Sequence, residues 1–211
     1  KLTPKGNWEH GNNILYTSKN ITEFAQQNKV DEEDFVEKLK HYKSKLQKVR
    51  WKREHPGLDD KILTSWNALM LKAYVDASTA LQKTEYLKIA ERNADFLYEN
   101  LWVNNKLFRN YKNERATIPG FLDDYAFLIE ALLALYQVNF KKDYLDWASE
   151  LIEICIRDFY DEETGLFFYT SKTEEQLIAQ KFEMNDNVTP AANSSLAKSL
   201  FIAGHILDEA P

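Results

Sequence analysis

Two aspartate pairs are the residues of this sequence best suited to chemistry. Asp59-Asp60 and Asp123-Asp124 each follow a leucine, and a strongly apolar helical pattern follows each pair. Two carboxylates at a set separation can hydrolyse a glycosidic bond, one as the acid and the other as a nucleophile or base. A carboxylate can also accept hydrogen bonds from sugar hydroxyls. We therefore take all four aspartates as candidate catalytic residues, and the sequence does not say which would be acid or base.

A structural role explains the same aspartates without any chemistry. Aspartate is a favoured helix N-cap because its carboxylate accepts a backbone N–H, which contributes about 1 kcal/mol. A second aspartate in the first turn gains from the helix dipole. Both effects lower a carboxyl pKa, which suits a base or hydroxyl acceptor better than an acid. The cap and the catalytic interpretations are both open at this point.

Polar and aromatic residues accompany the aspartates along the chain. A sugar site uses such a mixture, since hydroxyls need donors and acceptors while the C–H faces of the ring stack on aromatic side chains. We therefore predict that residues near the aspartates bind substrate, namely Lys61, Trp66, Asn67, Tyr125, Asp186 and Asn193.

Helices of three kinds must position these residues. Segments 62–75 and 126–135 are apolar on nearly all sides, so they should be buried on nearly all sides. Segments 86–101 and 144–160 carry polar residues at regular intervals and should lie outside. Segment 31–54 has one narrow apolar stripe, an acidic first turn and a basic second half, which predicts an amphipathic surface helix.

An internal repeat connects these helices. The Leu-Asp-Asp triplets lie 64 residues apart, a Tyr-Leu-x-x-Ala pattern recurs after 58 residues, and a Leu-Phe pair recurs after 59. Each unit contains a buried helix, an amphipathic helix and a short β-type segment, at 106–111 or 165–170. A third unit begins near Asp186 and continues into a helix at 191–207.

Alternating buried and outer helices predict an all-α fold of αα-hairpins around an axis. Either an α/α toroid, which we favour, or an α-solenoid satisfies the pattern. In a toroid the N-termini of the inner helices share one face. The aspartate pairs, the loop aromatics and the β-type segments should then converge there.

Composition excludes several classes of function. The 211 residues, 44% of them hydrophobic, suffice for one domain, which we expect to span residues 1–211. The net charge of -6 argues against a nucleic-acid partner. The sequence shows neither a long apolar run nor a signal-like start, so we expect no membrane partner and a cytoplasmic location.

Cysteine and histidine patterns predict no special chemistry. Cys155 lies in an apolar run and should be a core residue. No two histidines have metal-ligand spacing and the six glycines are scattered, so we predict no metal and no cofactor. The chain begins with Lys1 and ends soon after an apolar helical segment, so we expect it to be a piece of a longer protein.

Four ordered blocks resemble a known family. They are GNWEHGNNILY, RWKREHPGLDDKILTSWNALMLKAY, FLDDYAFLIEALLALY and DNVTPAANSSLAKSL. They resemble successive signature blocks of the spermatogenesis-associated protein 20-like family. The resemblance implies a protein with an N-terminal thioredoxin-like domain, which we expect to be absent from this chain. It also implies a helical toroid similar to six-hairpin glycosidases and N-acylglucosamine 2-epimerases, and this chain would form part of that toroid. It also adds Trp8, Glu9 and Arg53 to the candidate substrate-binding residues, and its blocks point to Pro190 as well.

The resemblance implies the fold and leaves the reaction open. The first hypothesis is a carbohydrate-binding or carbohydrate-active toroid, glycoside hydrolase-like or sugar epimerase-like if it is an enzyme, with the aspartates at its site. The alternative is a non-catalytic toroid that holds a protein or peptide client for a thioredoxin-like domain of the parent chain. Part of a ring would leave apolar helix flanks exposed, so we also expect self-association.

Overall fold

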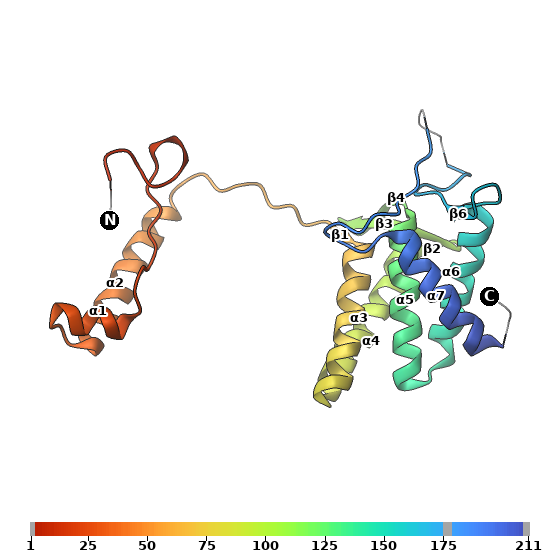
Figure 1. Cartoon of the computed structure of the whole chain (residues 1–211), viewed down its shortest axis with the longest axis horizontal. Helices are drawn as coiled ribbons and strands as arrows, with labels where there is room; N and C mark the ends of the chain where they lie inside the picture. Colours follow the sequence, from red (N-terminus) through yellow and green to blue (C-terminus); the bar gives the residue numbers. More distant parts are fainter. Residues whose placement is uncertain (1–2, 175–178, 209–211) are drawn as a thin grey trace. The chain divides into compact units, whose positions relative to one another are not determined.

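Helices account for most of the residues that the structure describes, 3–174 and 179–208 of this computed structural model (Figure 1). The chain divides by its contacts into two compact units, Lys1–Leu58 and Asp59–Pro211. The single domain expected from the sequence stays a prediction. Among the described helices, none combines the length and hydropathy needed to cross a membrane.

The first unit contains two helices and a short 3-10 turn, Glu9–Gly11. Helix α1 (Ile21–Asn28) is capped by Asn20, and α2 (Glu32–Arg50) is capped by Asp31, whose carboxylate accepts the Asp34 N–H at 2.9 Å. Helix α2 is the predicted amphipathic helix, and its later apolar residues Tyr42, Leu46 and Val49 are exposed within this unit.

The second unit has two layers of helices. Its elements are, in order, β1 (Ile62–Leu63), α3 (Thr64–Leu81), α4 (Thr84–Leu101), β2 (Trp102–Val103), β3 (Lys106–Lys112), β4 (Arg115–Pro119), α5 (Leu122–Asn139), α6 (Lys142–Asp158), β5 (Tyr160–Asp161), β6 (Leu166–Phe167) and α7 (Ala192–Leu207). Helix α5 packs against α3, α6 and α7, and α4 packs against α3. Helices α3, α5 and α7 therefore form one layer, and α4 and α6 form the other (Figure 1).

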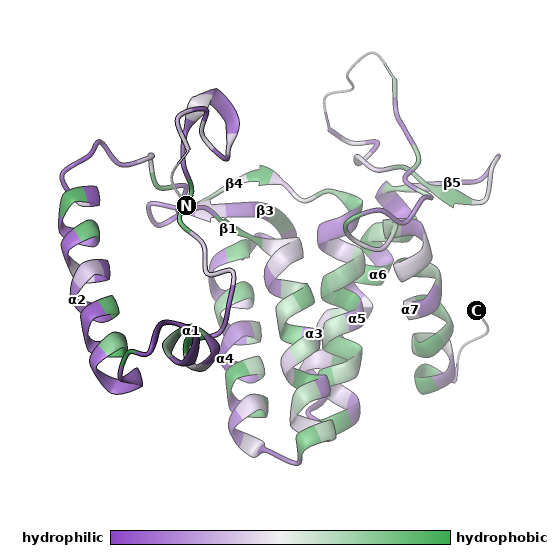
Figure 2. Cartoon of the chain, turned by 60° about the vertical axis from the view of Figure 1, so that its left-hand side comes forward, coloured by the Kyte–Doolittle hydropathy of each residue, from purple (hydrophilic) through white to green (hydrophobic). Residues whose placement is uncertain are grey.

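The core is centred on α5, which carries mostly hydrophobic residues, whereas α2 and α4 alternate hydrophilic and hydrophobic positions (Figure 2). Leu128, Ile129 and Leu132 of α5 are fully buried. Each such side chain contributes about 1.5–3 kcal/mol through burial. Cys155 of α6 is buried in the same core, as predicted.

Helix α3 is less buried than its sequence predicts. It packs against α4 and α5, while the large side chains Trp66 and Met70 are 68% and 53% exposed. The prediction of a helix buried on nearly all sides is thus confirmed for α5 and wrong for α3 in this chain.

A small antiparallel sheet covers one end of the helices. Strand β3 pairs with β1, β2 and β4, and β5 pairs with β6. The β-type segment predicted at 106–111 is confirmed, whereas the one predicted at 165–170 is only two residues long. In the β3–β4 register Phe108 faces Pro119 and Asn110 faces Thr117, which places Ile118 across from Arg109.

The structural repeat differs from the most visible sequence repeat. Helices α3 and α5 begin 58 residues apart, the same offset as the Tyr-Leu-x-x-Ala patterns. The Leu-Asp-Asp triplets, however, are 64 residues apart. The second triplet therefore opens α5, while the first precedes β1 and is not its structural equivalent.

Candidate functional site

Asp124 connects three elements at the start of α5. Its side chain is fully buried and accepts the N–H of Phe121 at 3.0 Å and the N–H of Ser65, in α3, at 2.9 Å. Arg109 of β3 donates from Nη1 to Asp124 Oδ2 at 2.8 Å. Neither aspartate of the second pair is the N-cap itself, which is Phe121; Asp124, the third residue of α5, binds back to the Phe121 N–H, and its carboxylate serves the starts of two neighbouring inner helices.

Asp123 shares the same guanidinium but reaches the surface. Arg109 Nη1 lies 2.8 Å from Asp123 Oδ1, and the Asp123 side chain is 15% exposed. The guanidinium also stacks on the Phe121 ring, 4.6 Å from its centroid. One positive charge thus balances two carboxylates, which leaves this cluster with one excess negative charge.

Burial and charge shift the proton affinities of this cluster. Burial raises the pKa of Asp124 to about 7, and the neighbouring Asp123 charge adds to the effect, against the opposing pull of Arg109 and of the Phe121 and Ser65 N–H groups. Burial lowers the pKa of Arg109, but the hydrogen bond to Asp123 and the Asp124 charge outweigh it, so the net shift is upward. Arg109 therefore stays protonated, and Asp124 titrates near neutral pH.

Two further side chains complete the surroundings of Arg109. The Tyr169 ring lies 5.3 Å from the Phe121 ring, and the Tyr169 carbonyl accepts the N–H of Leu122, the first residue of α5, at 2.9 Å. The ammonium of Lys181 lies 4.6 Å from the centroid of the Tyr169 ring. Burial, and then the charge of Asp123, raises the pKa of Tyr169 to about 12. We call this group the helix-start cluster; it consists of Arg109, Phe121, Asp123, Asp124, Tyr169 and Lys181.

The first aspartate pair lies outside the helix-start cluster. The expectation that it begins a helix is wrong, because 62–63 are extended and paired with β3, and α3 begins only at Thr64. Asp60 forms an ion pair with Lys112, whose hydrogen bond lowers the pKa of Asp60. Asp59 lies 3.3 Å from Lys61 Nζ and its side chain is 70% exposed. Each aspartate of this pair thus has its own lysine at the solvent edge.

Three predicted substrate-binding residues bind backbone groups instead. The Tyr125 hydroxyl is buried and accepts an N–H of β3 at 3.3 Å. Asp186 accepts the N–H of the residue before α7 at 2.8 Å. Asn193 exchanges two hydrogen bonds, of 2.8 and 2.9 Å, with the backbone of β6. These side chains hold the loops around the helix starts in place.

The remaining predicted residues lie at the surface. Lys61, Trp66 and Asn67 line a shallow pocket of about 350 Å³ beside β1 and the start of α3. The Asn67 amide donates to the Leu63 carbonyl at 2.8 Å. In the first unit, the exposed residues include Trp8, Glu9 and Arg53. In the second unit, Pro190 is exposed just before α7.

Four residues of the cluster were not predicted from the sequence: Arg109, Phe121, Tyr169 and Lys181. The position of Arg109 in the β-type segment 106–111, shortly before the second aspartate pair, was an available signal for the first of them. No local pattern marks the other three. Among residues 3–174 and 179–208 no group of three or more His, Cys, Asp or Glu side chains is arranged to hold a metal ion.

Backbone strain lies next to this cluster at Ile118. Its φ of 60° places a β-branched residue in the left-handed region, which costs about 1–3 kcal/mol. We expect Ile118→Gly to raise the free energy of unfolding by about 1 kcal/mol in urea denaturation, because glycine adopts positive φ without a steric cost. The matched control Thr117→Gly should lower it, since Thr117 has no positive φ and bonds to Asn110 at 3.1 Å. A loss of stability in both variants would contradict the claim that the backbone is strained at Ile118.

The arrangement defines a class of protein. Hairpins of an inner and an outer helix, with loops and short strands over the inner-helix N-termini, form part of an (α/α)6 toroid. A cellobiose 2-epimerase from Bacillus thermoamylovorans matches with a TM-score of 0.58 and 20% identity, over 74% of this chain and 42% of that one. A sugar epimerase from a ruminal bacterium matches with a TM-score of 0.60 and 14% identity, over 72% and 40%. A GH76 α-mannanase from Bacteroides thetaiotaomicron matches with a TM-score of 0.58 and 14% identity, over 74% and 41%.

Sequence relatives narrow the class further. An uncharacterized protein of Caenorhabditis elegans is 32% identical over 205 residues, which are 93% of this chain and 28% of that protein. Human spermatogenesis-associated protein 20 is 29% identical over 208 residues, 93% of this chain and 26% of that protein. The resemblance to the spermatogenesis-associated protein 20-like family is thereby confirmed. The chain spans only about a quarter of the length of these relatives, and no protein-family model matches it.

Proposed function

We propose that this chain forms one wall of a carbohydrate-binding site in a larger toroid, with the sugar at the helix-start cluster. The observation that carries the proposal is the partly exposed Asp123–Arg109 pair beside the rings of Phe121 and Tyr169. The fold supports it, because solved toroids with similar structures include proteins named as sugar epimerases and an α-mannanase.

The acidic, basic and aromatic side chains of the helix-start cluster have different roles in this proposal. The Asp123 carboxylate accepts sugar hydroxyls, Arg109 donates to them from its remaining N–H groups, and an aromatic ring packs on the C–H face of the sugar. Asp124 is a positioning residue, since its oxygens are engaged by Arg109 and two backbone N–H groups. In this proposal Asp59 and Asp60 do not contact the sugar, because each pairs with a lysine at the solvent edge.

Binding is the part of the function that we assign to this cluster. Glycoside hydrolysis needs two carboxylates that reach the substrate. Of the two aspartates in the cluster, only Asp123 is partly exposed, with 15% of its side chain accessible. Hydrolase-like or epimerase-like turnover would therefore require a second group from elsewhere in the toroid.

The test is saturation-transfer NMR of the complete toroid that contains this chain, against a panel of mono- and disaccharides. We expect at least one sugar to bind and Asp123→Asn to weaken it at least tenfold. The matched control is Asp143→Asn, because Asp143 is the second residue of the outer helix α6 just as Asp123 is the second residue of α5. Circular dichroism checks that both variants stay folded.

Two outcomes would contradict the proposal. Sugar binding that survives Asp123→Asn would place the site elsewhere. No binding across the panel would favour the alternative, a toroid that holds a client for a thioredoxin-like domain. That partner domain, self-association and the cytoplasmic location all stay predictions from the sequence.

A further inference from the structure

Helix α5 has one stripe of partly exposed residues along its buried part. Between Leu122 and Leu135 every residue is buried except Asp123, Glu130 and Ala134. Their spacings of seven and four residues place all three on one face of the helix. Asp123 belongs to the helix-start cluster, so this stripe contains both a carboxylate of the cluster and Glu130, with the buried Phe127 between them.

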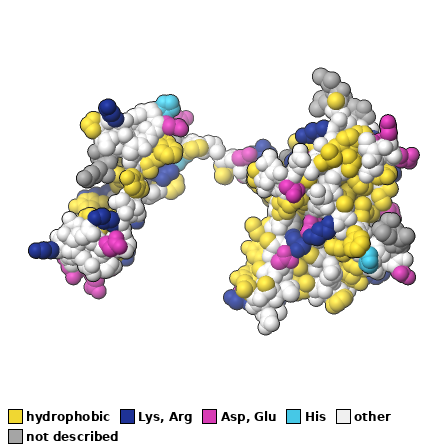
Figure 3. All heavy atoms as spheres, viewed as in Figure 1, with side chains coloured by type: hydrophobic (Ala, Val, Ile, Leu, Met, Phe, Trp, Pro, Cys, Tyr) yellow, Lys and Arg dark blue, Asp and Glu magenta, His cyan; other side chains and the backbone are white. Residues whose placement is uncertain are grey.

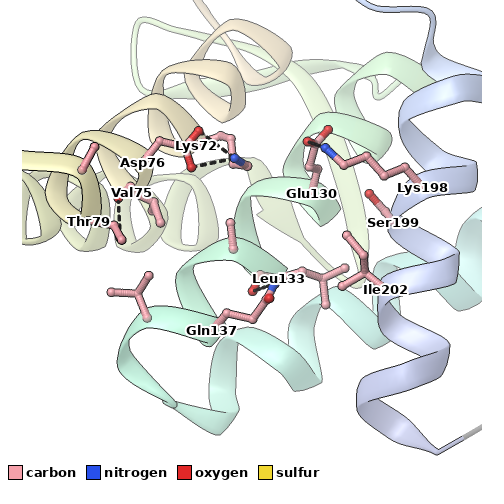
Figure 4. Close-up of a pocket in the computed structure, with 13 residues that line it drawn as sticks. Lys72, Val75, Asp76, Thr79, Glu130, Leu133, Gln137, Lys198, Ser199 and Ile202 are labelled. Atoms are coloured by element: carbon pink, nitrogen blue, oxygen red, sulfur yellow. Dashed lines mark hydrogen bonds and ion pairs between the residues drawn. The ribbon is translucent and has the colours of Figure 1, made fainter.

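Glu130 is held in place by the neighbouring inner helix α7. Ser195 Oγ donates to one carboxylate oxygen at 2.7 Å. Lys198 Nζ lies 2.7 Å from the other oxygen (Figure 4). Burial raises the pKa of Glu130, but the hydrogen bonds and charge of Lys198 and Ser195, with the charge of Lys72 on α3, outweigh it and give a lowered pKa. Glu130 is therefore an ionised, prepositioned hydrogen-bond acceptor.

A groove of about 440 Å³ surrounds Glu130 between α3, α5 and α7. Aliphatic side chains such as Val75, Leu133 and Ile202 line its walls. In the space-filling view, a small group of basic and acidic side chains lies among hydrophobic ones on the face of these helices (Figure 3). A largely apolar cavity with a few fixed polar groups is the usual form of a small-molecule site.

The polar groups of the groove indicate what kind of ligand fits. Its charges are balanced in two ion pairs, Lys72–Asp76 and Lys198–Glu130, so a charged ligand would have to break one of them. The hydroxyl of Ser199 is buried and has no partner among the described residues. In Figure 4 this side chain extends from α7 toward α5. The groove thus suits a neutral ligand that offers both hydroxyls and C–H surface.

We propose that the groove at Glu130 and the helix-start cluster form one elongated site for a neutral saccharide of at least two linked rings. Asp123 and Glu130 are seven residues apart on α5, which is about 10 Å along the helix axis. A single sugar ring is too short to contact both carboxylates, whereas two linked rings span that length. This inference rests on the proposed carbohydrate function and adds the size of the substrate.

The test compares the tightest-binding disaccharide of the panel with its component monosaccharide, by titration calorimetry on the complete toroid. Glu130→Gln should weaken disaccharide binding at least tenfold and change monosaccharide binding less than twofold. Ala134→Leu should do the same by filling the groove, since it leaves both ion pairs intact.

Glu91→Gln is the matched control. Glu91 lies on the outer helix α4 with its side chain 22% exposed, against 20% for Glu130. It is likewise bound by one lysine, Lys141 at 2.7 Å, and one neutral donor, Asn139 at 3.0 Å. Its replacement should leave both affinities unchanged.

The outcomes separate this inference from the proposed function. If Asp123→Asn abolishes binding while Glu130→Gln and Ala134→Leu leave the disaccharide affinity unchanged, the function stands and the elongated site is wrong. Equal losses in Glu91→Gln and Glu130→Gln would also overturn the inference, because the effect would then be a general loss of stability. If no sugar binds, both proposals fail together.

Discussion

Arg109→Met lowers the free energy of unfolding by about 3 kcal/mol or more at pH 8, as measured by urea denaturation. Arg109 lies between Asp123 and Asp124, within 2.8 Å of both carboxylates. Its removal leaves a fully buried Asp124 beside a mostly buried Asp123 with no countercharge, and two unpaired carboxylates in contact are strongly unfavourable. The loss should be smaller at pH 5, because Asp124 can then take up a proton and one of the charges disappears.

Arg157→Met provides the control for this prediction. Arg157 makes two close contacts with Asp158, at 2.7 and 2.8 Å, but its side chain is 68% exposed. Exposed ion pairs contribute little, so this variant should lose less than about 1 kcal/mol. Equal losses in the two variants, or a loss in Arg109→Met that does not depend on pH, would show that the buried charges are not the cause.

The fold was predictable because apolar periodicity depends only on local sequence. The all-apolar pattern after Asp123 gave a buried α5, and the spaced polar residues of α4 and α6 gave outer helices. The repeat was also predictable, although its register could not be taken from the aspartates. Local capping rules apply equally to both Leu-Asp-Asp triplets, while the extended pairing of Ile62 and Leu63 with β3 depends on a strand far along the chain.

Only part of the candidate site was predictable, because some of its residues meet through contacts between distant parts of the chain. Asp123 and Asp124 were found because their position at a helix start is a local signal. Arg109 joins them only because β3 folds back over the start of α5, and Lys181 reaches Tyr169 only through a loop contact. The stripe from Asp123 to Glu130 could have been read from the sequence, but its meaning depends on which face of α5 the other helices leave open.

The difference in free energy of unfolding between the wild-type chain and Asp124→Asn should fall as pH rises from 4.5 to 7.5. Burial, and then the charge of Asp123, raises the pKa of Asp124 to about 7 in the folded chain, from its ordinary value of 3.8. The folded state then holds a proton that the unfolded state releases. Its stabilising effect is complete below the unfolded pKa and is lost as pH rises through 7, with a limiting slope on the order of 1 kcal/mol per pH unit. Urea denaturation of both proteins at several pH values measures the difference.

Two variants test the cause of this pH dependence. Asp123→Asn removes the like charge beside Asp124, so the pKa of Asp124 should move toward its ordinary value and the slope should flatten. Asp143→Asn, at the equivalent position of α6, should keep the wild-type slope. A stability difference that instead grows with pH would mean that Arg109 and the two backbone N–H groups dominate over burial. Asp124 would then be an ordinary ionised cap, and the group of Arg109, Asp123 and Asp124 would keep one excess negative charge at every physiological pH.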